Sequence, residues 1–236
     1  MTTEPSIVVI ASTMRSGSTL LKALLAEADD VLNLPETNFQ SPATVSQILE
    51  DHRPEQPPIK VLKKPAWYHE TNAYPKLPQV EGLKTIALVR DLYDTVVSLR
   101  KMTFRWFAGW SAPWVTTWLA RKYWAGVTSS LVDKSESDAG NVLLVRYEDI
   151  VADPIAETRR LYSFIGSARE TGTDQYSPPS NYSWRWGSDD GSQNIKSLRV
   201  QAPRQKKRDE KRIVHLMEQT ESIRQLRKKL RYQQDG

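Results

Sequence analysis

The sequence predicts an α/β fold in which helices flank a doubly wound parallel sheet of about four to five strands. Short apolar runs, typical of strands buried on both faces, alternate along the chain with segments whose apolar residues recur at helical spacing. A small polar loop follows the first of these runs and leads directly into a helix. The 236 residues, 39% hydrophobic and 26% charged, suit one domain, which we assign to residues 1–236.

The first strand and the loop after it form the main candidate binding element. Ile7–Ala11 is apolar and mostly β-branched, Ser12–Thr19 is small and polar, and leucines at helical spacing follow. We expect Ser16 or Ser18 to cap this helix. Backbone N–H groups, the helix dipole and the Arg15 guanidinium favour an anion at this P-loop-like turn.

The loop departs from the Walker A motif of nucleoside triphosphatases. Ser18 follows Gly17 where that motif has lysine, and Ala11 occupies the place of its first glycine. Because the Walker lysine reaches the β- and γ-phosphates, its absence argues against a triphosphate. The loop suits a 5′-phosphate that carries one further small anionic group. The plain structural alternative is a serine-rich turn that binds no ligand.

Two further strands are predicted to bring basic residues to the same edge of the sheet. Ile59–Lys63 ends in lysines, and Thr85–Val89 is followed by Arg90. The carboxyl ends of parallel strands line the ligand crevice of such folds. Arg90 and Ser98, the latter in a helix expected at Leu92–Lys101, could grip one phosphate together. Alternatively, Arg90 pairs with a neighbouring aspartate and Ser98 bonds its own helix.

The middle of the chain is rich in aromatic residues. We expect most side chains of Phe104–Trp124 to pack in the core or a lid, and a minority to form an acceptor pocket. A helix is predicted over Thr116–Asp133, and Val142–Val145 reads as the fourth strand. Pro154 begins another helix, for which Gly166 is the expected C-cap.

The last third of the chain changes in character. Residues 167–205 are rich in Ser, Gly, Pro and Asp, which favours a lid or a loop that covers a bound cofactor. Residues 206–232 are predicted to end in one amphipathic C-terminal helix.

Composition excludes several classes of site and partner. The absence of cysteine excludes disulfides and cysteine-based metal sites. No apolar run is long enough to span a membrane and no signal peptide is recognisable, so we expect a cytoplasmic protein without a membrane partner. The net charge of +5 fits an anionic ligand. No aromatic-interleaved basic motif supports nucleic-acid binding, and the oligomeric state cannot be read.

Several of these motifs, in this order, resemble the sulfotransferases that use 3′-phosphoadenosine 5′-phosphosulfate (PAPS). Arg15–Leu21 after a strand resembles their 5′-phosphosulfate loop, and Arg90 with Ser98 resembles their 3′-phosphate motif. Val145–Asp149 is similar to a further signature of the family. The run Arg15–Phe39 is most similar to protein-tyrosine sulfotransferases and related bacterial sulfotransferases.

The resemblance implies roles for individual residues. Glu36 corresponds to the general base, and Lys63 to a catalytic lysine near the end of the second strand. The cytosolic small-molecule branch has a histidine base at the position near Pro65, and its absence here favours Glu36. His69 lies close to that position in the sequence and is the alternative base. Ser192, in a possible substitute for the family's glycine-rich loop, loosely resembles a transition-state-stabilising serine. The implied catalytic set is Glu36, Lys63, Arg15 and His69, and the implied cofactor-binding set is Arg15, Ser16, Gly17, Ser18, Thr19, Leu20, Arg90, Ser98, Tyr147, Ser192 and Arg199.

The resemblance also implies a reaction. A sulfuryl group would pass from PAPS to an acceptor hydroxyl or amine by in-line displacement, leaving adenosine 3′,5′-bisphosphate (PAP), with no metal required. We expect a small-molecule acceptor, and a phenol, a sugar or a peptide tyrosine all stay open. The alternatives from other classes are a P-loop-like small-molecule kinase and a non-catalytic peptide- or glycan-binding protein.

Overall fold

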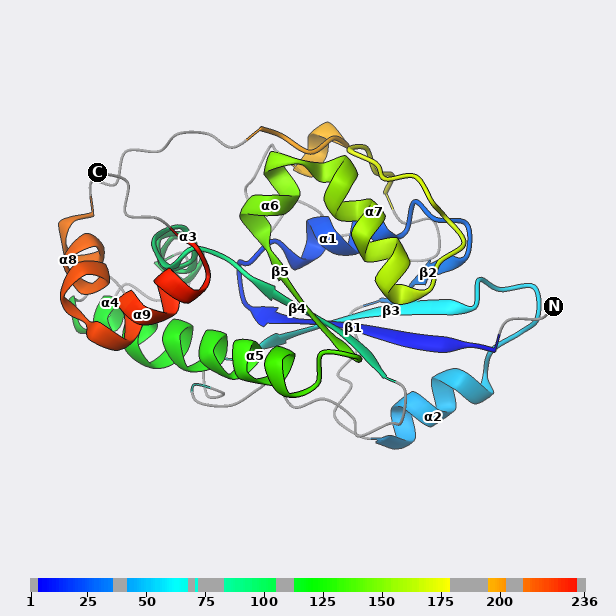
Figure 1. Ribbon diagram of the computed structural model, residues 1–236, viewed down its shortest axis with the longest axis horizontal. Helices are drawn as coiled ribbons and strands as arrows, with labels where there is room; N and C mark the ends of the chain where they lie inside the picture. Colours follow the sequence, from blue (N-terminus) through cyan, green and yellow to red (C-terminus); the bar gives the residue numbers. More distant parts are fainter. Residues whose placement is uncertain are drawn as a thin grey trace.

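The computed structural model describes residues 4–35, 42–67, 71, 83–104, 113–178, 195–202 and 210–232. Within them a five-stranded parallel sheet has the order β2-β3-β1-β4-β5, with helices on both faces (Figure 1). The strands are β1 (Ser6–Thr13), β2 (Val31–Asn33), β3 (Ile59–Ala66), β4 (Lys84–Val89) and β5 (Val142–Arg146). The predicted doubly wound sheet of about four to five strands is confirmed.

Helices connect the strands and complete the C-terminal part of the chain. They are α1 (Ser18–Leu25), α2 (Pro42–Glu50), α3 (Leu92–Phe104), α4 (Pro113–Trp118), α5 (Ala125–Ser137), α6 (Tyr147–Ala152), α7 (Pro154–Ile165), α8 (Lys211–Gln219) and α9 (Glu221–Lys229). A π-helical segment, η2 (Leu119–Trp124), joins α4 to α5, and a short 3-10 turn, η3, covers Ile195–Ser197. No helix within the described ranges is long and apolar enough to cross a membrane.

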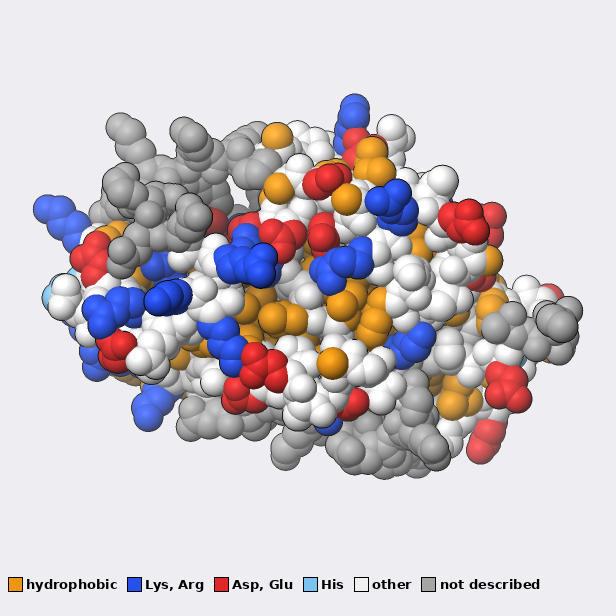
Figure 2. All heavy atoms as spheres, viewed as in Figure 1, with side chains coloured by type: hydrophobic (Ala, Val, Ile, Leu, Met, Phe, Trp, Pro, Cys, Tyr) orange, Lys and Arg blue, Asp and Glu red, His pale blue; other side chains and the backbone are white. Residues whose placement is uncertain are grey.

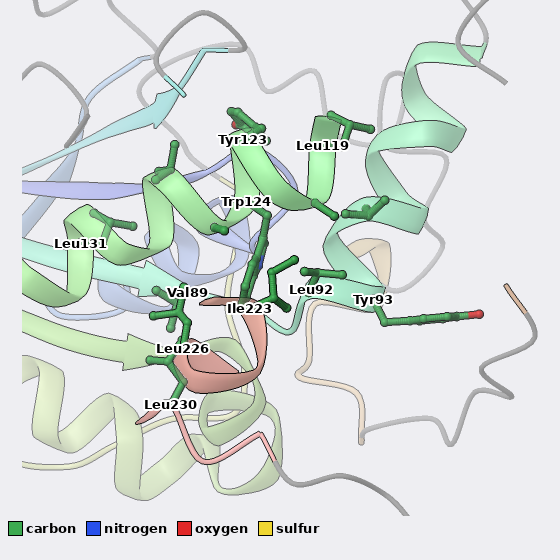
Figure 3. Close-up of a cluster of buried hydrophobic side chains, with 14 of the residues drawn as sticks. Val89, Leu92, Tyr93, Leu119, Tyr123, Trp124, Leu131, Ile223, Leu226 and Leu230 are labelled. Carbon is green, nitrogen blue, oxygen red and sulfur yellow. The ribbon is translucent and has the colours of Figure 1, made fainter. Parts of the chain in front are cut away.

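The alternation of side chains along the central strands explains why both faces of the sheet are covered. In β1, Val8 and Ile10 pack into a cluster with α1 and α7, whereas Val9 and Ala11 face the other side. There α5 and α9 cover the sheet, and the buried ring of Trp124 lies among their apolar residues (Figure 3). This two-sided burial is what the continuous apolar runs predict.

The strand order places a switch point beside β1. From β1 the chain passes to the edge strand β2 and returns to β3, which pairs with one side of β1, and β4 then pairs with the other side. The loops that leave the carboxyl ends of β1 and β4 therefore diverge to opposite faces and open a crevice between them. The predicted phosphate-binding residues follow these two strands.

The second predicted strand is longer than expected. β3 continues past Lys63 to Ala66, and Pro65 pairs in register with Ser12 of β1. The described part of β2 pairs only with Ile59–Val61. Within the described chain, the end of β3 therefore pairs with a strand on one side only. Proline has no N–H to donate, and such an edge position tolerates it.

The C-terminal segment forms two helices where one was predicted. Thr220 has an extended backbone (φ −97°, ψ 107°) that ends α8 and precedes α9. A β-branched threonine is a weak helix former, and Glu221 in the first turn of α9 favours a new helix start. The helix predicted over Thr116–Asp133 is also divided, into α4, η2 and α5, and it extends to Ser137. The predicted C-cap is confirmed, because Gly166 ends α7 in the left-handed conformation with φ 81°.

The stretch expected to form a lid is packed at its start. Tyr176 is buried, its N–H donates to the Leu198 carbonyl, and the Ser167 hydroxyl donates to Asp30. Residues 167–178 therefore lie against the body of the domain, because these side chains tie them to neighbouring elements. Residues 179–194, the middle of the expected lid, lie outside the described part of the chain.

Candidate cofactor-binding site at the ends of β1 and β4

The loop after β1 has an unusual backbone. Arg15 and Gly17 both have positive φ, of 67° and 91°. Gly17, and neither Ser16 nor Ser18, is the N-cap of α1, because the left-handed turn is easiest for glycine. The Ser16 hydroxyl instead contacts the Thr13 hydroxyl inside the loop. The free N–H groups at the start of α1 remain available to an anion.

Tyr147 covers this loop from the start of α6. A Cβ atom added to Gly17 would lie 2.3 Å from Tyr147 Cδ2, so only glycine fits beneath the ring. The Arg90 guanidinium lies over the same ring, 4.3 Å from its centroid. Burial raises the pKa of Tyr147, and Arg90 partly offsets this. Tyr147 therefore stays neutral at physiological pH and contributes a flat, uncharged wall.

Three residues expected to bind phosphate lie together. Arg15 Nε donates to Ser98 Oγ at 2.9 Å, and Arg90 Nη1 donates to the Arg15 carbonyl at 3.1 Å. Among the described residues, Arg90 does not pair with an aspartate, so the alternative in which a neighbouring aspartate neutralises it does not hold. Its buried Nε has no hydrogen-bond partner there, so it is a donor that a bound anion would satisfy.

Lys63 reaches the same region from β3. Its Nζ donates to Thr19 Oγ1, in the first turn of α1, at 3.1 Å. Three cationic side chains, Arg15, Lys63 and Arg90, thus surround the N-terminus of α1. This positive charge fits a ligand with two anionic groups. A nucleotide that carries two such groups would also suit the unpaired Arg90 Nε and the close approach of the Gly17 backbone to the Tyr147 ring.

Other residues singled out from the sequence are not brought together with this cluster. The Arg199 side chain is 63% exposed and pairs with Asp174 at 2.7 Å, in a surface ion pair. Glu36, His69 and Ser192 lie outside the described residues. The chain leading to Glu36 is nevertheless tied to α1, because buried Lys22 donates to the Leu34 carbonyl.

Comparison with known proteins gives the same picture. Residues 81–170, less than half of the chain, match the model of a sulfotransferase family, and this segment includes Arg90, Ser98 and Tyr147. The fold is that of the sulfotransferases. The resemblance predicted from the sequence is therefore confirmed, although no protein of curated function matches the chain.

Three solved sulfotransferases illustrate the likeness. A sulfotransferase domain from the curacin biosynthetic pathway has a TM-score of 0.57 at 19% identity, covering 97% of this chain and 98% of that one. The sulfotransferase domain of the Synechococcus PCC 7002 olefin synthase has a TM-score of 0.56 at 20% identity, covering 98% and 97%. A mouse sulfotransferase in complex with PAP has a TM-score of 0.50 at 17% identity, covering 68% and 58%.

Sequence reasoning missed two residues that support this candidate site. Tyr123 and Trp124 were assigned to packing within an aromatic stretch, and both are fully buried. Their polar atoms also form hydrogen bonds with the backbone of the two segments predicted to bind phosphate, at Met14 and Arg90. No spacing in the sequence indicates this, because the partners lie 109 and 34 residues away.

Proposed function

We propose that this chain transfers a sulfuryl group from PAPS to an acceptor hydroxyl or amine by in-line displacement. The observation that carries the proposal is the Arg15–Ser98–Arg90 cluster, which joins the loop after β1 to the corner after β4. A ligand with separate 5′ and 3′ anionic groups would use both segments. An ADP- or ATP-binding site needs only the first.

We assign the roles of Arg15, Arg90, Ser98 and Lys63 from their positions, and that of Glu36 from the sequence resemblance. The N–H groups at the start of α1, with Arg15, bind the 5′ end of the nucleotide, and Arg90 with Ser98 binds its 3′-phosphate. When bound, PAPS supplies an activated sulfuryl group. Lys63, held beside Thr19, balances negative charge on the oxygens at this end of the ligand. Glu36 accepts the proton of the acceptor, which we propose to be a small metabolite.

Thermal unfolding with nucleotides tests the proposed cofactor. PAP without metal should raise the melting temperature by several degrees, because a ligand at about 100 times its Kd adds roughly 2.7 kcal/mol to the free energy of unfolding. ADP should have a smaller effect. A shift that requires ATP and Mg²⁺ would instead favour the kinase. The absence of any shift would favour a non-catalytic binding protein.

Glu36→Gln tests the proposed base. This change should abolish most sulfuryl transfer while leaving the PAP-induced thermal shift intact, because the amide keeps the size of the side chain but cannot accept the proton. His69→Asn is the matched control and should retain activity. Normal turnover in Glu36→Gln, with loss of turnover in His69→Asn, would transfer the role of base to His69.

A further inference from the structure

We propose that Tyr123 and Trp124 are positioning residues that hold the two phosphate-binding segments at a constant separation. This inference rests on the proposed function, since it assumes that the segments bind the 5′ and 3′ ends of one nucleotide. Both residues lie at the end of η2, between α4 and α5. Short π-helical segments are rare and often occur at functional sites.

Tyr123 acts at the point where the pairing of β1 and β3 ends. The last pair in register is Thr13 with Ala66. One residue further, the Tyr123 hydroxyl accepts the Met14 N–H at 2.8 Å and donates to the Ala66 carbonyl at 2.7 Å. The hydroxyl thus continues the hydrogen-bond ladder by one step. The chain at Met14 is fixed immediately before Arg15 turns into the left-handed conformation.

Trp124 acts on the other segment. Its Nε1 donates to the Arg90 carbonyl at 2.9 Å, at the corner between β4 and α3. The ring is fully buried among apolar residues of α3 and α9, and it points from its helix toward Leu92 and Ile223 (Figure 3). The direction of the Arg90 main chain, and with it the guanidinium, is therefore set by a rigid side chain.

Adjacent residues thus bind the backbone on both sides of the switch point. Phenylalanine at either position would supply most of the same apolar surface, so packing alone does not require the hydroxyl or the indole N–H. Each polar atom instead satisfies a backbone group of the site in a buried setting, where an unpaired group is costly. Because one rigid helix carries both side chains, the spacing between Arg15 and Arg90 is built before any nucleotide binds.

Affinities for two nucleotides separate the two roles. Tyr123→Phe should weaken PAP and AMP alike, by about three- to tenfold, because the loop it holds binds the 5′ group common to both. Trp124→Phe should weaken PAP by a similar factor and leave AMP within about twofold, because only PAP carries a 3′-phosphate. The Met14 amide should also exchange with solvent faster in Tyr123→Phe.

Tyr162→Phe is the matched control. Its fully buried hydroxyl also donates to a backbone carbonyl, that of Leu24 at 2.6 Å, but on the opposite face of the sheet. It should leave both affinities unchanged. If Trp124→Phe does not fold, Tyr123→Phe, which loses a single oxygen, still tests the inference against this control.

Three outcomes would overturn the inference. If all three variants, Tyr162→Phe included, lose nucleotide affinity only in proportion to their loss of melting temperature, Tyr123 and Trp124 have a general structural role and not a specific positioning role. Unchanged affinities in Tyr123→Phe and Trp124→Phe, with wild-type PAP binding intact, would reject the inference and leave the proposed function standing. If the wild-type protein binds neither PAP nor AMP, both the inference and the proposed function are rejected.

Discussion

At Gly17 the backbone of the site passes directly beneath an aromatic ring. The residue combines φ 91° with a Cβ position that would lie 2.3 Å and 2.6 Å from two ring atoms of Tyr147. Both features disfavour a residue with a Cβ atom for independent reasons, one conformational and one steric. The ring that Gly17 admits is also the one over which Arg90 lies. A change here is therefore expected to affect both segments that we propose bind phosphate.

Gly17→Ala should weaken PAP binding at least tenfold and lower the free energy of unfolding. The left-handed backbone alone costs alanine about 1–2 kcal/mol, and displacement of Tyr147 adds to this. Isothermal titration and urea unfolding would measure the two effects. Gly140→Ala is the control, since no atom lies within 4 Å of its added Cβ and its φ is not positive. Equal effects of the two substitutions would contradict the prediction.

Glu148 holds the turn between β4 and α3, at Arg90 and Asp91, by a hydrogen bond to its backbone. Its Oε1 accepts the Asp91 N–H at 2.9 Å. Burial raises the pKa of Glu148 above its ordinary 4.5, and the nearby Asp91 carboxylate raises it further. The folded protein therefore binds this proton more tightly than the unfolded chain. The stability that results is present below about pH 4.5 and is lost as the pH rises through the pKa of the folded state.

Glu148→Gln should remove this pH dependence while keeping an acceptor for the Asp91 N–H. The free energy of unfolding of the variant, relative to wild type, should increase as the pH rises from about 4.5 through the raised pKa, and then level off. Urea unfolding at a series of pH values would measure it. Glu218→Gln on the exposed side of α8 is the control. A difference that does not vary with pH would show that Glu148 is not the titrating group.

At the scale of elements, α9 is joined to the Arg90 corner by a buried ion pair. The side chains of Arg227 and Asp91 are 5% and 6% exposed, with Nη2 and Oδ2 3.3 Å apart. Asp91 Oδ1 also accepts the Tyr93 N–H at 2.9 Å, which fixes the first turn of α3. A C-terminal helix thus determines the geometry of a loop more than a hundred residues earlier in the chain.

Arg227→Met should lower the free energy of unfolding by about 3–5 kcal/mol, because it leaves the buried Asp91 carboxylate without its cation. Combining it with Asp91→Asn should recover much of the loss, since no buried charge then lacks a partner. Urea unfolding measures both. Arg224→Met, which removes the exposed Arg224–Glu221 pair on the same helix, should cost no more than about 0.5 kcal/mol. Similar losses in Arg227→Met and Arg224→Met would refute the distinction.

At the scale of the whole molecule, the C-terminal helices complete the core on one face of the sheet. Residues of α8 and α9 belong to the same buried cluster as Val89 and Trp124 (Figure 3). Charges are mixed on the surface above: Figure 2 shows Lys and Arg interspersed with Asp and Glu on the face in view. The buried cluster beneath this surface joins Ala11 of β1 to side chains of α8 and α9, so residues from both ends of the described chain pack together near the site.

Removal of residues 220–236 should prevent cooperative folding. It deletes four buried hydrophobic side chains, Ile223, Leu226, Leu230 and Tyr232, which are 0%, 9%, 2% and 8% exposed. At about 2–5 kcal/mol for each large apolar side chain lost from a core, the sum matches or exceeds a typical total stability of about 5–15 kcal/mol. Near-UV circular dichroism would show the loss of fixed packing. A truncated chain that unfolds cooperatively would contradict this prediction, and full-length Arg224→Met controls for changes to the surface of α9.

The class of fold, four of the five strands and the motifs that follow them could be predicted from the sequence, whereas the short edge strand β2 could not. These features depend on local pattern: apolar runs, the spacing of leucines, and polar residues at strand ends. Because parallel strands bring their carboxyl ends to one edge, the proximity of Arg15, Arg90 and Ser98 could also be predicted. Three features became visible only in the folded chain: the hydrogen bonds of Tyr123 and Trp124 to Met14 and Arg90, the pairing of Arg227 with Asp91 and the surface position of Arg199. Each of these depends on contacts between residues distant in the chain, which no local pattern encodes.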